Sequence, residues 1–275
     1  RFLMARGTLV SRQGAGTVVA DAPPRFRIAL VNGYPDSAHA PSPDGCTIEW
    51  VTSRVALTQG ALNSFDGVIW NCPGLPEIDI ARKLGADLPQ IIINREMPDL
   101  NFVSTDHRGA IHGITAERLK HLPQAVPVFL SVPDISSNLP YLQRREGFVD
   151  ACRSRSRFYE ELALPFEFEG KIAALKQLQS QHPDKTLLIV SATMYHTGAV
   201  VAWRRESGLE WQHSLWYSDF DNECPECYWG VRISSFVQDI PGLQTTALEQ
   251  MGNLLMGAES SVRMILPARR VDGQT

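Results

Sequence analysis

Residues 187–206 read LLIVSATMYHTGAVVAWRRE, which is a continuous apolar run followed by a segment whose apolar residues have helical spacing. A strand without polar alternation is typical of a parallel sheet that helices cover on both faces. We therefore predict a strand over residues 187–190 and a helix over residues 197–206. A strand followed by a helix is the repeating unit of an α/β fold.

The same alternation continues in both directions along the chain. Helical spacing recurs over residues 109–122, 139–153 and 170–181, and further short apolar runs lie at 28–31, 48–51, 68–70, 91–93, 126–130 and 213–217. A chain of 275 residues is long enough for two such halves. We predict a two-lobed α/β protein in which each lobe is a mainly parallel sheet flanked by helices. Ligands of such folds bind beyond the carboxyl ends of the strands, and the cleft between the lobes is the expected pocket.

The composition is that of an ordinary globular protein, with 44% hydrophobic and 20% charged residues. No apolar run approaches the roughly twenty residues needed to cross a bilayer, and the start of the chain has no apolar signal core. Five scattered cysteines do not form the dense disulfide framework of a small secreted domain. We expect a cytoplasmic protein with reduced thiols and no membrane partner.

Residues 1–24 have a pattern that differs from the body over residues 25–275. The segment before Gly7 is typical of a helix end, since glycine readily takes the left-handed C-cap conformation. Two β-prone runs, residues 8–12 and 16–20, lie on either side of flexible turn residues and predict a hairpin.

This order of helix end, glycine and hairpin resembles the end of a GntR-type winged helix-turn-helix, in residues 5–20 (ARGTLVSRQGAGTVVA). The resemblance implies a wing that contacts operator DNA, with Arg12 and Gln13 as contacts, while a plain surface hairpin is the alternative. Residues 1–27 carry a net charge of +4 and the remainder −8, so the basic front is the part suited to phosphate groups. The resemblance includes no recognition helix, and we expect DNA binding to depend on an upstream part of that domain.

From residue 26 onward the chain resembles the effector-binding core of LacI/GalR-type repressors. The matching segments are residues 27–31 (RIALV), 65–69 (FDGVI), 88–95 (LPQIIINR), 103–106 (VSTD), 109–110 (GA), Arg144 with Gly147 and Phe148, 217–221 (YSDFD), 243–246 (LQTT) and 266–267 (LP). The resemblance implies the two-lobed fold of periplasmic sugar-binding proteins, a homodimer, a small-molecule effector and no cofactor. It places lobe 1 at about residues 25–132 and 247–260, and lobe 2 at about residues 133–246 and 261–275.

The resemblance also implies two ligand contacts, Asp106 and Arg144. A carboxylate can accept two hydroxyl protons and a guanidinium offers a rigid fork of donors, which suits a sugar-like or acidic effector. As alternatives, Asp106 caps its helix and Arg144 pairs with Glu146 or another acid. Loop position and chemistry add further candidates, which are Tyr34, Asp36, Asn71, Arg95, Asp221 and Trp229. Trp229 would stack on a flat ligand face, with ordinary burial as its alternative, and Asp221 is either an effector contact or a turn residue.

Two segments depart from the family pattern and put a pentose or hexose effector in doubt. Residues 191–196 (SATMYH) lack the Asn-Asp pair usual there, and His196 either replaces that polarity or is a surface histidine. Residues 222–240 also differ and contain Cys224 and Cys227. This spacing can hold a metal or form a redox pair, but no second pair completes a four-ligand zinc site, so a plain loop or an adventitious disulfide is the alternative.

The leading functional hypothesis is a transcription regulator that senses a small molecule and controls operator binding as a dimer. A solute-binding protein of a transport system is the alternative, because one fold serves both functions. The sequence contains no nucleophile elbow, Walker loop or HExxH motif, and we expect no enzymatic activity.

Overall fold

The computed structural model describes residues 9–12, 16–19, 26–32, 45–224, 226, 228 and 230–275. Near the start, β1 (Leu9–Arg12) and β2 (Gly16–Val19) pair antiparallel, with Leu9 opposite Val19 and Arg12 opposite Gly16. The predicted hairpin is therefore confirmed. The predicted helix end, its Gly7 stop and the turn residue Gln13 lie outside the described residues.

The chain forms two compact units and passes from one to the other three times. Unit 1 contains residues 1–104 and 240–266, and unit 2 contains residues 105–239 and 267–275. These boundaries differ from the expected lobe limits at 132 and 246. The first crossing comes earlier because the helix after it packs inside unit 2, where Ile111 and Ile114 join a core cluster with Phe129.

Unit 1 is built on a six-stranded sheet in the order β13-β7-β6-β5-β3-β4. The pairs from β4 through β3, β5 and β6 to β7 are parallel. Its strands are β3 (Phe26–Val31), β4 (Cys46–Val51), β5 (Gly67–Asn71), β6 (Gln90–Ile93), β7 (Phe102–Thr105) and β13 (Arg263–Leu266). Its helices are α2 (Ser53–Ala56), α3 (Leu75–Leu84), the short 3-10 helix η2 (Gly85–Asp87) and α8 (Ile240–Met256).

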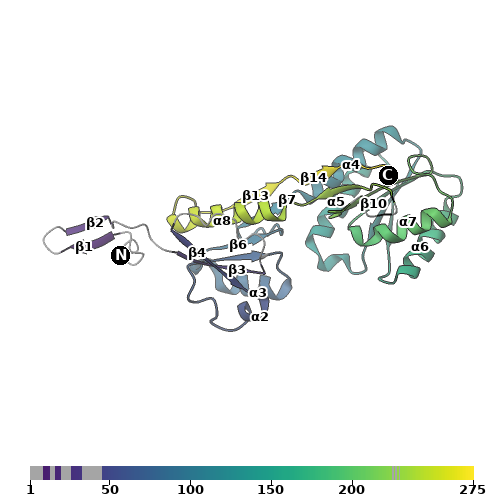
Figure 1. The fold of residues 1–275 in the computed structure, drawn as a ribbon. Helices are drawn as coiled ribbons and strands as arrows, with labels where there is room; N and C mark the ends of the chain where they lie inside the picture. The colour runs from purple at the N-terminus through teal and green to yellow at the C-terminus, as the bar shows by residue number, and fades with distance from the viewer. Residues whose placement is uncertain are drawn as a thin grey trace. The chain divides into compact units, whose positions relative to one another are not determined.

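One core cluster of unit 1 lies between this sheet and α8. Ile69, Ile91 and Ile93 pack with Leu248 and Met251 of the helix. Gly67 allows the close approach, since a Cβ there would lie 2.6 Å from the Met251 sulfur. Figure 1 shows α8 on one side of the sheet and α2 and α3 on the other.

Unit 2 has a second six-stranded sheet, in the order β14-β12-β11-β10-β8-β9. All its pairs are parallel except that β14 runs antiparallel to β12. Its strands are β8 (Val126–Ser131), β9 (Glu160–Ala163), β10 (Leu187–Ser191), β11 (Leu215–Phe220), β12 (Ser234–Val237) and β14 (Arg269–Val271). Its helices are α4 (His107–His121), η3 (Ile135–Ser137), α5 (Leu139–Ser154), α6 (Phe168–Gln181), η4 (Met194–His196) and α7 (Thr197–Glu206).

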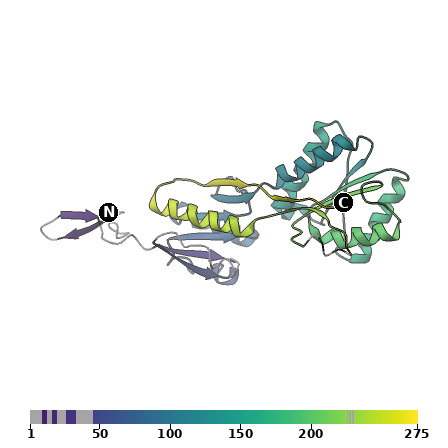
Figure 2. The same ribbon diagram turned by 45° about the horizontal axis from the view of Figure 1, so that its top comes forward.

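Strand β10 has a core on each face, as its unbroken apolar run predicts. Leu188 and Val190 belong to the cluster with α4 and α5, whereas Leu187 and Ile189 belong to the cluster with α6 and α7. Figures 1 and 2 both show the teal pair α4 and α5 and the green pair α6 and α7 on opposite sides of the sheet. The predicted fold class, two mainly parallel sheets flanked by helices, is confirmed.

The strands and helices predicted from apolar spacing are all present, with ends that shift by a few residues. Residues 243–246, which match the family pattern, lie inside α8, which begins at Ile240. Within the described part of the chain, no helix has the length and apolar character that crossing a membrane requires.

Candidate functional site

Arg144 lies in the second turn of α5 and is almost entirely buried, with a side chain 1% exposed. Its Nε donates to His107 Nδ1 at 3.3 Å, and its Nη1 donates to the Ala192 carbonyl at 2.7 Å and to Asp221 Oδ2 at 2.8 Å. The guanidinium also lies 3.7 Å from the centre of the Phe220 ring. Helix α5 and the ends of β10 and β11 thus hold one cation in a fixed position.

Burial lowers the pKa of the Arg144 guanidinium, and the neighbouring Asp221 carboxylate opposes that shift. Arginine stays protonated in proteins, so this site is an ion pair between a buried cation and a partly exposed carboxylate. The sequence left Glu146 as a possible partner of Arg144, but Asp221 takes that place and Glu146 Oε2 lies 3.9 Å from Arg108 instead.

Asp221 directly follows β11 and has a left-handed backbone, with φ of 70°. Its Oδ2 accepts from Arg144, and its Oδ1 accepts from Gln238 Nε2 at 2.5 Å. Gln238 in turn accepts from the Thr105 hydroxyl at 3.2 Å. Sequence reasoning did not select Thr105 or Gln238 as site residues, because they adjoin β7 and β12, two strands that it did not predict.

Asp106 is the N-cap of α4, where its Oδ1 accepts from the Gly109 amide at 2.7 Å. Its capping alternative is therefore confirmed. A Cβ at Gly109 would lie 2.1 Å from Asp106 Oδ2, so a larger residue there would require the Asp106 side chain to shift. The Asp106 side chain is partly exposed, and its contact with a ligand stays a prediction.

In unit 1, three strands end in residues with a left-handed backbone, which is uncommon outside glycine. They are Asn32 after β3, Cys72 after β5 and Asn94 after β6, with φ of 55°, 47° and 62°. The candidate Asn71 is buried next to Cys72, and its Nδ2 donates to the Asn32 carbonyl at 2.8 Å. Arg95 donates from Nη1 to the Asn94 carbonyl at 2.8 Å. The structure thus places Asn71 and Arg95 at neighbouring strand ends.

A second polar group adjoins Asn32 and was not found from the sequence. The Ser53 amide donates to Asn32 Oδ1 at 2.9 Å, and the Ser53 hydroxyl donates to Glu77 Oε1 at 2.5 Å. Asn32 Nδ2 also donates to the Ser53 hydroxyl. Because Ser53 begins α2 and Glu77 lies in α3, the carboxyl edge of this sheet carries a connected polar network.

Three exposed aromatic side chains lie just after strand ends of unit 2. Phe166 and Phe168 follow β9 and are 75% and 48% exposed, and Tyr195 follows β10 and is 71% exposed. A Cβ at Gly198 would lie 3.7 Å from the Phe168 ring. Exposed aromatic faces beside polar groups suit sugar rings and other flat ligands. The sequence pointed to Trp229 for this role, and Trp229 lies outside the described residues.

A buried group of hydroxyl, imidazole and carboxyl side chains lies near the carboxyl ends of β10 and β11. Asp219 Oδ2 accepts from Asn222 Nδ2 at 3.0 Å and from the Thr197 hydroxyl, and burial raises the Asp219 pKa to about 6. The interpretation of His196 as a surface histidine was wrong, because it is 1% exposed and lies 3.1 Å from the Ser191 hydroxyl. Burial lowers its pKa to about 4.

Several predicted positions are not tested by this structure. Tyr34, Asp36 and Cys227 lie outside the described residues, and Arg12 is placed only as the last residue of β1. Cys224 is exposed. Among the described residues, no group of three or more histidine, cysteine, aspartate and glutamate side chains could hold a metal ion.

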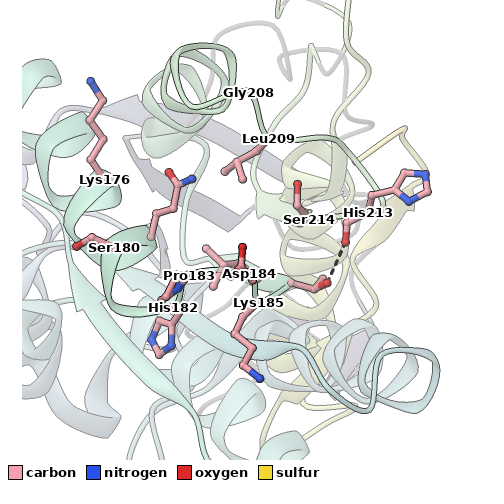
Figure 3. Close-up of a pocket in the computed structure, with 13 residues that line it drawn as sticks. Lys176, Ser180, His182, Pro183, Asp184, Lys185, Gly208, Leu209, His213 and Ser214 are labelled. Carbon is pink, nitrogen blue, oxygen red and sulfur yellow. Dashed lines mark hydrogen bonds between the residues drawn. The ribbon is translucent and has the colours of Figure 1, made fainter.

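A separate cavity of about 720 Å³ lies at the other end of the unit 2 sheet, near the amino ends of β10 and β11 (Figure 3). Of its lining residues, Lys176 pairs through Nζ with Glu206 Oε2 at 2.8 Å, and His182 Nε2 lies 2.7 Å from Glu160 Oε1. Two of its basic side chains therefore already have acidic partners. The carboxyl edges remain the candidate site.

No protein-family model and no curated protein matches the sequence. Solved structures do match in fold. The chain is similar to a transcriptional regulator CelR in complex with cellobiose, with a TM-score of 0.70, 16% identity, and coverage of 92% of this chain and 86% of that one. It is also similar to a LacI-family regulatory protein from Chloroflexus aggregans, with a TM-score of 0.72, 17% identity, and coverage of 90% and 98%. A third match is the lac repressor dimer bound to operator and the anti-inducer ONPF, with a TM-score of 0.70, 17% identity, and coverage of 91% and 94%.

Proposed function

We propose that this chain is the effector-sensing part of a cytoplasmic, DNA-binding transcription regulator of the LacI type. The observation that carries the proposal is the gathering of polar side chains at the carboxyl ends of parallel strands in both units. That is where open α/β sheets bind ligands. The fold shared with regulators supports the same conclusion. For the front of the chain we further propose a GntR-type wing with Arg12 and Gln13 on DNA, supported by the β1–β2 hairpin and by the net charge of +4 over residues 1–27.

The effector that suits unit 2 is a neutral, hydroxyl-rich molecule such as a sugar, rather than an acid. Arg144 already pairs with Asp221, and Asp106 adds a second, partly exposed carboxylate at the start of α4. An acidic ligand would face uncompensated negative charge there, whereas hydroxyl groups would donate to these carboxylates. Phe166 and Tyr195 supply aromatic faces, and Asn71 and Arg95 are further proposed contacts.

Regulation would arise because the effector binds one arrangement of the protein better than another. Switching a population almost completely requires about 5.5 kcal/mol of differential binding, which two effector sites in a homodimer can provide together. A dimer also presents two DNA-binding heads to two half-sites. No catalytic step is part of this function.

The test is a thermal-shift screen of the chain with cellobiose, other neutral sugars, polyols and sugar acids. A ligand at one hundred times its Kd stabilises the folded state by about 2.7 kcal/mol. Two matched variants locate the site, since Phe166 follows the carboxyl end of β9 whereas Phe158, 79% exposed, precedes its amino end. We expect Phe166→Ala to reduce the sugar-induced shift and Phe158→Ala to leave it unchanged.

A screen in which no neutral sugar or polyol stabilises the chain contradicts the proposed effector class. Equal losses in the two phenylalanine variants contradict the proposed location. A regulator also requires that the full-length gene product bind DNA in an effector-dependent manner, whereas a transport protein would bind sugar without binding DNA.

A further inference from the structure

The polar contacts around Arg144 form a closed ring. Arg144 donates to His107 Nδ1 at 3.3 Å and to Asp221 Oδ2 at 2.8 Å. Gln238 donates to Asp221 Oδ1 at 2.5 Å and accepts from the Thr105 hydroxyl at 3.2 Å. Thr105 and His107 are two residues apart in the chain, which closes the ring through the backbone.

The ring lies at two of the three places where the chain passes between the units. Thr105 is the first residue of unit 2 after one crossing, and Gln238 is the last but one before another. The third crossing, between Leu266 and Pro267, carries no member of the ring. These hydrogen bonds therefore connect the Arg144–Asp221 pair to two of the crossings. The third crossing can serve as a control in an experiment.

Among the described residues, each polar end of Gln238 faces a suitable partner. Its NH₂ faces a carboxylate and its carbonyl oxygen faces a hydroxyl, so a flipped amide would set acceptor against acceptor at Asp221. Arg144 is buried, where an unpaired polar group is costly. Breaking one link thus disturbs its neighbours as well.

We propose that Gln238 is a positioning residue that couples the Arg144–Asp221 pair to the two chain crossings. A ligand that hydrogen-bonds to the Asp221 carboxylate would compete with Gln238 for that acceptor. Gln238 would then also lose its hydrogen bond with the Thr105 hydroxyl. The chain would become less stable locally at both of these crossings, and its stability at the third crossing would not change. The regulatory use of this coupling depends on the proposed function, but the coupling itself exists in the ligand-free chain and is measurable there.

The experiment is hydrogen exchange with mass spectrometry on the ligand-free chain. Asp221→Asn keeps the side-chain shape but turns an N–H toward either Arg144 or Gln238, both of which are donors. We expect exchange about fivefold faster over residues 102–106 and 236–240, which corresponds to one net hydrogen bond. Exchange over residues 264–266 should not change. Asp150→Asn, in the exposed Arg108 pair at 2.5 Å that also joins α4 and α5, is the matched control and should leave all three crossings unchanged.

A double-mutant cycle isolates Gln238. Gln238→Leu should accelerate exchange at both crossings, and Asp221→Asn should add nothing at residues 102–106 in that background. Gln238→Asn, too short to reach both partners, serves as a second variant if leucine impairs folding. Additive effects, or a change confined to residues 221–224, would overturn the coupling. Sugar binding without coupled exchange refutes this inference alone, whereas coupled exchange without any sugar binding refutes the proposed effector alone.

Discussion

Arg144 and Asp221 form one ion pair in unequal surroundings, with side chains 1% and 30% exposed. Asp221→Ala leaves a buried cation without its counter-ion, whereas Arg144→Met leaves a carboxylate that water can reach. We expect Asp221→Ala to lower the free energy of unfolding by about 3–5 kcal/mol and Arg144→Met to lower it by less. Urea unfolding at pH 7 measures both. Asp150→Ala, in a mostly exposed pair, should cost no more than about 1 kcal/mol, and a larger loss for Arg144→Met than for Asp221→Ala would contradict this argument.

Asp219 and His196 have opposite effects on stability over one pH range. The Asp219 pKa is raised from 3.8 to about 6, so its contribution to stability is full below pH 3.8 and is lost as the pH rises to about 6. The His196 pKa is lowered from 6.5 to about 4, so its contribution is full above pH 6.5 and is lost as the pH falls to about 4. Between pH 4 and 6, the two contributions to the unfolding free energy therefore change in opposite directions as the pH rises.

Replacing either residue alone should therefore expose the pH dependence that the other residue gives to the unfolding free energy. We expect the unfolding free energy of Asp219→Asn to rise from pH 4 to 6.5, and that of His196→Gln to fall from pH 4 to 6. The span of either change is about 3 kcal/mol, from two pKa units of displacement. Urea titrations at half-unit steps measure it. Parallel profiles for the wild type and both variants would mean that neither group titrates as described.

Among single residues, Arg144, Asp221 and Asn71 could be selected from the sequence as candidates, but their hydrogen-bond partners could not. Arg144 meets Asp221 across 77 residues, and the acid only two positions away, Glu146, lies near Arg108 instead. Partners of this kind depend on which strands are neighbours in the sheet. Phe166 and Tyr195 were missed for a different reason, because an aromatic residue's exposure cannot be read from its identity.

At the scale of elements, the contact between α4 and α5 depends on one glycine. A Cβ at Gly147 would lie 2.2 Å from the Arg108 carbonyl oxygen in the facing helix, so Gly147→Ala must push the helices apart. Overpacking of this kind costs about 1–3 kcal/mol. Gly113, in the same α4, has open space where its Cβ would be, and Gly113→Ala should instead stabilise by about 0.5–1 kcal/mol. Thermal unfolding compares the two, and the same sign for both would refute the close-approach argument.

Elements with continuous apolar runs were predictable, and those without them were not. Strand β10 is buried along its whole length, which its sequence shows directly. Strand β9 alternates between half-buried and exposed residues at the sheet edge, and β14 has three residues of which two are exposed. Strand β7 (FVST) is buried, but two of its four residues are polar, so it has no continuous apolar run. Short, polar and edge strands take their structure from neighbours rather than from local preference.

At the scale of the whole molecule, the two-unit organisation followed from length and alternation, but the crossing points did not. Both α4 and the sheet of unit 1 have apolar residues suited to packing, and local sequence does not say which unit a helix joins. Ile111, Ile114 and Leu119 settle the question by packing in the core of unit 2. Element type is local information, whereas membership of a unit is set by three-dimensional packing.

The proposed homodimer has a testable surface in unit 1. Trp50, Val55 and Leu57 are 42%, 51% and 40% exposed, and they lie within eight residues spanning the edge strand β4 and α2. Apolar side chains gathered on one edge favour burial against a second copy. We expect sedimentation velocity to show a dimer, and Val55→Glu to raise the dimer dissociation constant at least tenfold, because a carboxylate would be buried twice in a symmetric contact.

The matched control is Gln177→Glu, which adds the same charge at an exposed position of α6 and should leave the dimer intact. A monomeric wild type would contradict the dimer itself, whereas equal dissociation constants for the two variants would place the contact on a different surface.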